Sequence, residues 1–532
     1  MSKSSIIRAQ NLCVGYSLTQ LIFDQQTFSI PKGFTGITGQ NGSGKTTLIK
    51  TLAGEKKPVS GSLERSGTVG YLAQTDHRYD LLSVGDFFGV QNILESIKKV
   101  ENGLGTPEDF DQIGQNWEPE KEARATLDML GFVNLDLHQS IKHLSGGEKR
   151  SLAIGRLLFE KPDILLLDEP GNDLDQDNKR CLIHSLRQFK GSVIMISHDR
   201  DLLSHTDQII ETMQGQIRLY PGNWDHYRMV RDLEAESVDR KLDFELQKKR
   251  QQLKSHQQKT EERKKKESHG KKKSERRGWD KITRNSKIGK AQKSEARLSV
   301  LLNKQKEELR DGINDLRESQ KKRLRPDFNI KGQKRSESKI LVDVKEVNHS
   351  FDGHKRLYPV PVNLVLRGSQ KVAIKGANGS GKSSLIHMIT GDLTPEFGEI
   401  YKGFKKLCFI DQQLSLLNSE LTLLENFRAV NPDLPLSECH FRLSQHLLKD
   451  EMTGKQISEL SGGELLRAHL ACFISGETEI DLLILDEPTN HLDLESIEAL
   501  EKSLNLFEGA MLIISHDKFF LEAIQIDHVL EL

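Results

Sequence analysis

Short apolar runs and amphipathic stretches follow one another in two separate parts of the chain. The runs Gly36–Thr38 and Val372–Ile374 come directly before glycine-rich segments, and the amphipathic stretches Thr46–Ala53 and Ser383–Ile389 come directly after them. An apolar run, a glycine-rich turn and an amphipathic helix in this order are typical of a parallel α/β layer. The pattern therefore predicts two α/β domains, one in each half of the chain.

The two halves repeat one another. Four segments of the first half return in the second half in the same order and with nearly the same residues. Lys45 and Lys382 are 337 residues apart, whereas Ser145 and Ser461 are only 316 apart. The first half therefore carries about twenty additional residues, as duplicated domains with one local insertion would, and we expect an arm-like insertion near 90–124. The repeated segments are Thr38–Thr47 and Lys375–Ser384, Leu144–Glu148 and Leu460–Glu464, Leu165–Pro170 and Leu483–Pro488, and Ile196–Asp199 and Ile514–Asp517.

The segment between the two halves has the pattern of two helices. Leu242, Leu246 and Leu253 lie among charged residues on its outgoing side, and leucines and isoleucines recur at helical spacing over 298–316 on its returning side. A basic, glycine-containing stretch over 267–290 separates the two sides. We expect an antiparallel helical hairpin in which a helix of about 35–40 residues extends about 50–60 Å. The predicted domains are a first α/β domain over 1–225, the hairpin linker over 226–335 and a second α/β domain over 336–532.

Composition limits the class of protein. No apolar run approaches the roughly 20 residues of a membrane-spanning helix, and the N-terminus lacks the apolar stretch of a signal peptide. We therefore expect a soluble, cytoplasmic chain without a membrane domain. The five cysteines are scattered and never spaced as Cys-x-x-Cys, which argues against a disulfide framework and against a zinc site.

The net charge of zero hides a strong asymmetry. Residues 241–340 hold 33 Lys and Arg against 15 Asp and Glu, so this segment carries +18 and the rest of the chain carries −18. A basic block between two acidic blocks is typical of a segment that meets a polyanion.

Two glycine-rich segments match the pattern G-x-x-x-x-G-K-[ST]. Their glycines let backbone N–H groups turn toward phosphate oxygens, and the helix that follows adds a favourable dipole. Lys45 and Lys382 would reach the β- and γ-phosphates of ATP, and Thr46 and Ser383 would offer hydroxyls to Mg²⁺. One match alone would also fit a plain glycine-rich turn, but two matches in the same context argue against chance. The ATP-binding residues predicted here are Gly39, Gln40, Asn41, Gly42, Ser43, Gly44, Lys45, Thr46, Thr47, Gly376, Ala377, Asn378, Gly379, Ser380, Gly381, Lys382, Ser383 and Ser384.

Acidic pairs follow two of the apolar runs. Asp168 and Asp486 end these runs, where a carboxylate can hold Mg²⁺. Glu169 and Glu487 come next, where a carboxylate can polarise the attacking water. An acidic pair is more often a solvated loop pair, but its return in both halves argues against that interpretation.

Histidines and glutamines follow other apolar runs. His198 and His516 each come after a short apolar run, as do Gln74 and Gln412. Taken alone, a histidine in such a place is more often a structural hydrogen-bonding group than a catalytic one. Both interpretations stay open from the residues alone, and the glutamines alone are unremarkable.

The order of these motifs, with Leu-Ser-Gly-Gly-Glu between the glutamine and the acidic pair, resembles the ABC ATPase superfamily in both halves. Leu-Ser-Gly-Gly-Glu is the most specific motif, because other phosphate-loop ATPases lack it. The resemblance implies two cassettes that pair head to tail around two ATP molecules. Each ATP would lie between the phosphate loop of one cassette and the Leu-Ser-Gly-Gly-Glu of the other. The residues that this adds to the ATP sites are Ser145, Gly146, Gly147, Glu148, Ser461, Gly462, Gly463 and Glu464.

The resemblance also gives roles to single residues. It implies that Gln74 and Gln412 help to hold Mg²⁺. It implies a catalytic role for His198 and His516.

Two aromatic residues are open to either of two interpretations. Tyr16 and Phe351 match the aromatic that stacks on adenine in the ABC superfamily. Ordinary strand packing explains the two aromatics nearly as well.

Two cassettes on one chain, no membrane domain and a charged linker of about a hundred residues resemble the ABC-F subfamily. The fold implied is a pair of ABC-type phosphate-loop α/β cassettes joined by an antiparallel helical hairpin, and the activity implied is Mg²⁺-dependent hydrolysis of ATP to ADP and phosphate. The segment Glu487–Asp493 has the sequence expected of this subfamily. The first copy departs from it at Gly171 and Asp173, which stand in place of threonine and histidine, so we expect the two ATP sites to differ in turnover.

Members of the ABC-F subfamily are largely translation factors whose linker enters the ribosome at the vacant exit-tRNA site and approaches the peptidyl-tRNA. The resemblance therefore implies the ribosome, its RNA and tRNA as partners. Dense Lys and Arg attract RNA phosphates independently of sequence, and Trp279 could stack on an exposed base, although a solvated helix face also explains a run of charge. The candidate RNA contacts are Lys264, Lys265, Lys266, Lys271, Lys272, Lys273, Arg276, Arg277 and Trp279.

Three functions stay open from the sequence. The first is an ATPase that acts on the ribosome, either as a housekeeping translation factor or as a ribosome-protecting antibiotic-resistance factor. The second is the nucleotide-binding subunit of a transporter, which would need a separate membrane partner and would follow membranes on fractionation. The third is a DNA-repair ATPase, but such proteins often carry much longer coiled coils or Cys-rich zinc modules, which this sequence lacks.

Overall fold

The computed structural model describes residues 5–17, 19–73, 82–114, 116–132, 135–172, 174–275, 304, 307, 310, 311, 336, 338–351, 356–412, 414, 416–446, 448, 450–474, 480–490 and 492–532. It forms two compact units. One unit comprises Met1–Tyr227 and Pro326–Leu532 and contains both α/β cassettes, and the other comprises Arg228–Arg325.

The first cassette is built on a six-stranded sheet. Its strands are β3 (Phe34–Gly39), β5 (Val69–Leu72), β6 (Ile164–Asp168), β7 (Ser192–Ile196), β8 (Gln208–Met213) and β9 (Gln216–Pro221). They lie in the order β5-β6-β7-β3-β8-β9, and all neighbours are parallel except β8 and β9. All five residues of β6 and of β7 are buried, as expected for parallel strands covered on both faces.

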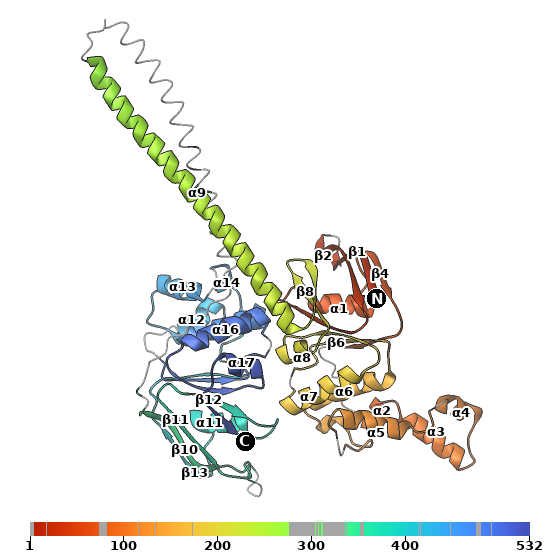
Figure 1. Cartoon of the computed structure of the whole chain (residues 1–532). Coiled ribbons are helices and arrows are strands. Elements are labelled where there is room, and N and C mark those ends of the chain that lie inside the picture. The colour runs from red at the N-terminus through yellow and green to blue at the C-terminus, as the bar shows by residue number, and fades with distance from the viewer. Residues whose placement is uncertain are drawn as a thin grey trace. The chain divides into compact units, whose positions relative to one another are not determined.

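A second, antiparallel sheet covers one side of the first cassette. Its strands are β1 (Ser5–Ser17), β2 (Gln20–Pro31) and β4 (Ser60–Arg65), in the order β2-β1-β4. Helix α1 (Lys45–Ala53) lies between the two sheets, because its Leu48, Ile49 and Leu52 share one buried cluster with residues of β1, β2 and β6 (Figure 1). This core fixes the start of α1, where the glycine-rich loop ends.

The remaining helices of the first cassette include a small projecting arm. The helices are α2 (Val84–Phe87), α3 (Gln91–Glu101), α4 (Pro107–Ile113), α5 (Pro119–Met129), η1 (Ile141–His143), α6 (Gly146–Glu160), α7 (Gln176–Gln188) and α8 (Arg200–Ser204). Helix α5 packs on α6 as α13 (Leu436–Gln445) packs on α15 (Gly462–Ile474) in the second cassette. Helices α3 and α4, which pack on each other, have no counterpart between α12 and α13 among the described residues.

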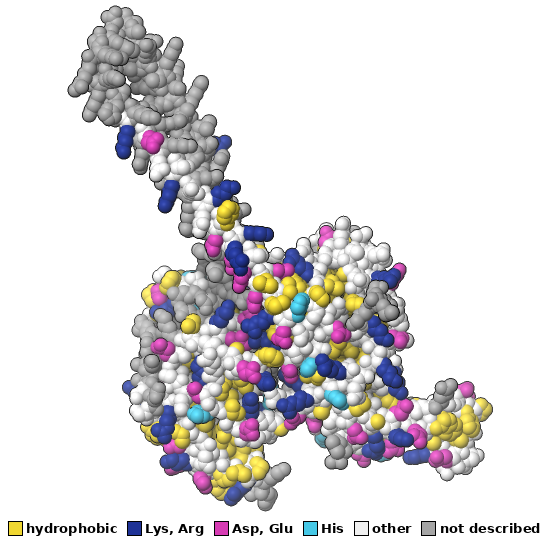
Figure 2. All heavy atoms as spheres, viewed as in Figure 1, with side chains coloured by type: hydrophobic (Ala, Val, Ile, Leu, Met, Phe, Trp, Pro, Cys, Tyr) yellow, Lys and Arg dark blue, Asp and Glu magenta, His cyan; other side chains and the backbone are white. Residues whose placement is uncertain are grey.

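The arm buries polar side chains beside Ile97 and Ile113 and exposes apolar side chains on its surface. The Ser96 hydroxyl donates to Asp109 Oδ1 at 3.0 Å between α3 and α4. Leu104, Phe110 and Trp117 are exposed, and the rings of Phe110 and Trp117 meet edge to face with 6.3 Å between centroids. Figure 2 shows hydrophobic side chains gathered at the end of this arm.

The second cassette has the same two sheets. Its parallel sheet has the order β14-β15-β16-β12-β17, and its antiparallel sheet has the order β11-β10-β13. The strands are β10 (Ile340–Asn348), β11 (Val362–Arg367), β12 (Lys371–Lys375), β13 (Phe397–Lys402), β14 (Leu407–Ile410), β15 (Leu482–Asp486), β16 (Ala510–Ile514) and β17 (His528–Glu531). The helices besides α13 and α15 are α11 (Lys382–Thr390), α12 (Leu423–Val430), α14 (Asp450–Thr453), η2 (Ile457–Glu459), α16 (Leu494–Leu506) and α17 (Lys518–Ala523). The predicted strand, loop and helix units at β3–α1 and β12–α11 are confirmed.

Helix α9 (Trp224–Glu275) is longer than the sequence analysis predicts. It runs for 52 residues, which is about 78 Å at 1.5 Å per residue. Gly270, which we placed in the tip loop, lies inside this helix; one glycine costs a helix only about 1 kcal/mol, and its neighbours are mostly strong helix formers. The first turn is anchored, since the Tyr227 hydroxyl donates to Glu211 Oε1 on β8 at 2.7 Å.

The predicted returning helix lies largely outside the described residues. Residues 304, 307, 310 and 311 are helical. Arg276, Arg277 and Trp279 of the predicted tip lie outside the described residues, as do the side chains of Lys264, Lys266, Lys271, Lys272 and Lys273.

Candidate ATP sites between the two cassettes

The glycine-rich loops join β3 to α1 and β12 to α11 in the same way. Each loop ends on a glycine in left-handed conformation, Gly44 with φ 91° and Gly381 with φ 94°. A Cβ atom on Gly44 would come within 2.3 Å of Ile22 Cγ2, and one on Gly381 within 2.8 Å of Tyr358 Cε1. Glycine is therefore required at both positions by backbone conformation and by space.

The lysine after each of these glycines holds its own loop together. Lys45 Nζ donates to the carbonyl oxygens of Gly39 and Gln40 at 2.8 and 2.9 Å. Lys382 Nζ donates to those of Gly376 and Ala377 at the same two distances. Each ammonium group thus lies inside the curve of its loop, where it would meet a phosphate group.

A carboxylate ends the neighbouring strand in each cassette. Ser383 Oγ donates to Asp486 Oδ2 at 3.1 Å, and the Thr46 hydroxyl makes the same kind of bond to Asp168. Burial raises the pKa of Asp168 and of Asp486. Within the described part of the chain, Asp168 Oδ2 is buried without a hydrogen-bond partner. A hydroxyl beside a carboxylate supplies the hard oxygen ligands that Mg²⁺ prefers, so the residues present fit this ion.

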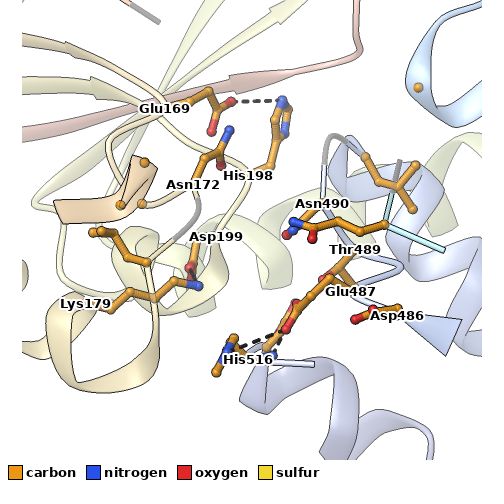
Figure 3. A pocket seen from close by; sticks show the side chains of 18 of the residues that line it. Glu169, Asn172, Lys179, His198, Asp199, Asp486, Glu487, Thr489, Asn490 and His516 are labelled. Atoms are coloured by element: carbon orange, nitrogen blue, oxygen red, sulfur yellow. Dashed lines mark hydrogen bonds and ion pairs between the residues drawn. The ribbon is translucent and has the colours of Figure 1, made fainter. Parts of the chain in front are cut away.

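The next residue in each cassette is a strained glutamate beside a histidine. Glu169 has φ 51° and Glu487 has φ 47°, a left-handed conformation that costs a non-glycine residue on the order of 1–3 kcal/mol. His198 Nε2 lies 3.5 Å from Glu169 Oε1, and His516 Nε2 lies 3.7 Å from Glu487 Oε1 (Figure 3).

Burial sets the protonation of these groups. It raises the pKa of Glu169 against the opposing effect of Lys45, and it raises the pKa of Glu487 to about 7. It lowers the pKa of His198 and lowers that of His516 to about 4, so both imidazoles are neutral at pH 7. Among the described residues, Glu487 Oε1 and Nε2 of each histidine find no hydrogen-bond partner. A glutamate whose pKa is raised toward neutral pH, beside a neutral imidazole, can order and polarise a water molecule.

Hydrogen bonds join each loop to the other cassette. Asn41 N donates to Asp493 Oδ2 at 2.9 Å, and Gln40 Nε2 donates to Glu495 Oε2 at 2.8 Å. On the other side, Asn378 N donates to Asp175 Oδ2 at 3.5 Å. Asp175 and Asp493 were not among the predicted site residues. The signal was present, since each ends the segment after the Asp-Glu-Pro motif.

A cavity of about 1260 Å³ lies between the cassettes and is lined by residues of both. This is larger than the roughly 300–1,000 Å³ of a single small-molecule site and suits two nucleotides. Figure 3 shows Glu169 and His198 near one part of it and Glu487 and His516 near another. The predicted site residues that line it are Tyr16, Asn41, Gly42, Gly44, Lys45, Thr46, Thr47, Ser145, Gly146, Gly147, Asp168, Glu169, His198, Phe351, Asn378, Gly379, Gly381, Lys382, Ser383, Ser384, Gln412, Ser461, Gly462, Asp486, Glu487 and His516.

Some predicted residues have other surroundings. Glu148 closes a capping box at the start of α6 by accepting from Ser145 N and Ser145 Oγ at 2.8 and 2.7 Å. Glu464 accepts from Ser461 in the same way. The predicted residues that do not line the cavity are Gly39, Gln40, Ser43, Glu148, Gly376, Ala377, Ser380, Gly463 and Glu464. Gln74, Asp173 and His491 lie outside the described residues.

Tyr16 and Phe351 are not packed in the core. The two residues are 75% and 70% exposed. Lys56 Nζ lies 4.2 Å from the centre of the Tyr16 ring, and His349 meets Phe351 edge to face with 4.8 Å between centroids. Both rings are therefore accessible from the cavity that they line.

Comparison with known proteins places the chain in a family. A family model described as ABC transporter matches residues 23–172 and 360–490, more than half of the chain. The energy-dependent translational throttle protein EttA of Escherichia coli is 30% identical over 94% of this chain and 87% of its own length. ABC transporter F family member 5 of Arabidopsis thaliana is 28% identical over 99% of this chain and 75% of its own length. The chain belongs to the F subfamily of the ABC ATPases.

Other proteins are similar to this ABC-F chain. The ATP-binding protein Uup of Buchnera aphidicola is 28% identical over 97% of this chain and 79% of its own length. The solved structure of RNase-L inhibitor superposes with a TM-score of 0.53 at 20% identity, over 98% of this chain and 88% of that one. This likeness shows a shared tandem-cassette fold.

The predicted fold class, family and enzyme class are thereby confirmed. As an ABC-F ATPase, the chain binds and hydrolyses ATP. None of the described helices has the length and apolar content needed to cross a membrane.

Proposed function

We propose that this ABC-F ATPase acts on the ribosome in the cytoplasm. The observation that carries the proposal is the 30% identity, over 94% of the chain, with an Escherichia coli protein named for throttling translation. The charge of α9 supports it, since residues 241–275 hold 13 Lys and Arg against 6 Asp and Glu. Lys265, the one candidate RNA contact whose side chain the structure describes, is exposed.

At each site, we assign the steps of hydrolysis to residues of both cassettes. Lys45 and Lys382 bind the phosphates, and Tyr16 and Phe351 stack on adenine. Asp168 with Thr46, and Asp486 with Ser383, would hold Mg²⁺, which neutralises charge on the phosphate oxygens. Gln74 and Gln412 are proposed to complete the Mg²⁺ shell.

Water activation is assigned to the glutamate and histidine pairs. Glu169 and Glu487 polarise the attacking water, and His198 and His516 hold the neighbouring phosphate oxygen through an N–H donor. The serine and glycines of each Leu-Ser-Gly-Gly-Glu close the opposite site. Each ATP site therefore consists of residues from both cassettes, and ATP binding would draw the two cassettes together.

The linker gives the sharpest test of ribosome binding. The eight candidate cations Lys264, Lys265, Lys266, Lys271, Lys272, Lys273, Arg276 and Arg277 would be changed to Gln in a Glu169→Gln, Glu487→Gln chain that retains ATP. Co-sedimentation with ribosomes would be measured across a salt series. We expect weaker binding and a flatter dependence on salt, because fewer phosphate counterions are released.

A matched variant tests whether position matters or only total charge. Eight exposed cassette cations, Lys98, Lys121, Arg124, Lys142, Lys161, Arg180, Lys345 and Lys518, would be changed to Gln instead. We expect this variant to lose less binding and to keep more of the salt slope. Equal behaviour of the two variants would contradict a specific role for the linker, and no co-sedimentation of the parent would contradict ribosome binding itself.

A second comparison separates two roles on the ribosome. A translation factor should change the growth or protein synthesis of untreated cells when it is deleted. An antibiotic-resistance factor should change the inhibitory concentration of a ribosome-targeting drug instead. Deletion strains with and without such drugs therefore divide the proposal into its two forms.

A further inference from the structure

A buried ion pair joins the two cassettes beside the cavity. Arg200, on α8 of the first cassette, donates from Nη1 to Glu501 Oε1, on α16 of the second, at 2.5 Å. The Arg200 side chain is 5% exposed and that of Glu501 is 12% exposed. Helix α8 also packs against α17 of the second cassette. This pair lies in the contact surface itself, where solvent does not screen it.

A second cation of the first cassette lies in the same surface. Lys179 Nζ on α7 is 2.6 Å from Asp199 Oδ2, and both side chains are largely buried (Figure 3). Burial by itself lowers the pKa of Lys179, but Asp199, and then Asp517 and Glu487 of the second cassette, raise it on balance. Burial, and then Asp199, raise the pKa of Asp517. Lys179 therefore lies among carboxylates of both cassettes that would otherwise repel one another.

The duplicated positions repeat these charges only in part, since Asp517 stands in place of Asp199. Counting from the repeated Asp175 and Asp493, the second cassette has Ile497 in place of Lys179, and the first cassette has Ile183 in place of Glu501. Lys518 stands in place of Arg200, but its side chain is 67% exposed and lies 3.8 Å from Glu522 on its own helix. The cations of this surface thus come from the first cassette, and three of its four acids, Glu487, Glu501 and Asp517, come from the second.

A buried ion pair adds little to net stability. Desolvation offsets most of the attraction, whereas one partner left alone is strongly unfavourable. We propose that Lys179, Asp199, Arg200, Glu501 and Asp517 form a charge key, and that it makes the closed, ATP-holding pair specific to the union of the first cassette with the second. A pair of two first cassettes would bury Arg200 opposite Ile183. A pair of two second cassettes would bring two copies of Asp517 together without Lys179.

The test exchanges the charges of the joining pair in the full chain. Arg200→Glu, Glu501→Arg and the double variant would be assayed for ATPase kcat/KM without ribosomes, so that the outcome is independent of ribosome binding. We expect each single change to lower kcat/KM by about tenfold or more, because like charges then face each other. The double variant should return to within about threefold of the parent, because the pair is restored in reverse.

Lys179 provides a second measurement if the charge exchange prevents folding. Lys179→Ile copies the residue of the second cassette, Lys179→Arg keeps the charge, and Arg180→Ile changes the neighbouring cation, whose pair with Asp177 is exposed. In a Glu169→Gln, Glu487→Gln chain, the ATP retained after gel filtration reports closure of the pair. We expect Lys179→Ile to retain less ATP than the parent, and Lys179→Arg and Arg180→Ile to match it.

Two results would overturn the charge key. One is a double variant no better than the product of the two single losses, which would show that Arg200 and Glu501 do not act on each other. The other is equal ATP retention by Lys179→Ile and Arg180→Ile. Thermal unfolding without nucleotide would identify any variant whose loss comes from misfolding.

Discussion

The two cassettes are alike where they would hold phosphate and different where they meet. Lys45 and Lys382 bond their loops at identical distances, and the two glutamates adopt the same unusual backbone conformation. Around these groups, however, the described residues of the first cassette include the arm helices α3 and α4, and its Lys179 stands where the second cassette has Ile497. Binding a phosphate group requires the same loop geometry in both cassettes. The surface between the cassettes has to fit only the other cassette, so its residues can differ.

The difference extends to the residue after the Glu-Pro pair. Gly171 occupies the place of Thr489, and a Cβ atom on Gly171 would come within 2.5 Å of Leu202 Cδ1. Leu202 is fully buried on α8, the helix that carries Arg200. The packing of α8 in the first cassette therefore leaves no room for a side chain at position 171.

The largest expected effect is on turnover. Changing both Glu169 and Glu487 to Gln should lower kcat by about 10²–10⁴-fold, because a positioned general base contributes that much, while ATP binding remains. The two single variants should keep unequal residual rates, since the surroundings of the two glutamates differ. ATPase assays and ATP-binding titrations of all three variants check this prediction. Equal residual rates would show that the two ATP sites do not differ in turnover. Parental turnover in the double variant would contradict the assignment of the glutamates.

An intermediate effect is expected on stability. Gly171→Thr should lower the free energy of unfolding of the first cassette by about 1–3 kcal/mol, because it overpacks the contact with Leu202. The reverse change, Thr489→Gly, should cost the second cassette less, about 0.5–1 kcal/mol, mainly through added freedom of the unfolded chain. Hydrogen exchange of the two cassettes under native conditions measures both values separately. A larger loss for Thr489→Gly would show that Gly171 is not explained by packing.

The sequence predicts the parts of the site that are local in the chain. An apolar strand followed by glycines, lysine and a helix can adopt few arrangements, so the β3–α1 and β12–α11 units follow from the residues themselves. The order of motifs then identifies the family. The additional residues of the arm could be located by counting between Lys45 and Ser145, because repeats provide an internal ruler.

Contacts between distant residues could not be predicted in this way. Asn41 and Asp493 are 452 residues apart, and nothing in either segment indicates the other. The repeat gives no sign of the ion pair of Arg200 and Glu501, because Ile183 stands at the position that matches Glu501. The predicted end of α9 was wrong, because Gly270 was interpreted as part of a loop although its neighbours favour a helix.

The smallest expected effect concerns two helix caps of the same kind, Asp109 in the arm and Glu425 in the second cassette. Each closes a capping box, with Thr106 and Thr422 respectively, but Asp109 also accepts from Ser96 and Lys99. These bonds hold the pKa of Asp109 below its usual value, as the bonds from Thr422 do for Glu425. Their stabilisation is therefore complete above the ordinary carboxyl pKa of about 4 and is lost as the pH falls below it.

Asp109→Ala should accordingly speed amide exchange in the arm more than Glu425→Ala does around α12, and both effects should disappear in strongly acidic solution. ATPase activity should stay within about twofold of the parent in both variants, because surface changes away from a site usually alter energies by no more than about 0.5 kcal/mol. The measurement is amide exchange by mass spectrometry at pH 7 and at several lower values, with ATPase assays at pH 7. Equal exchange in the two variants would mean that Ser96 and Lys99 add nothing to the cap. A large loss of ATPase activity in the Asp109 variant alone would mean instead that the arm takes part in the catalytic cycle.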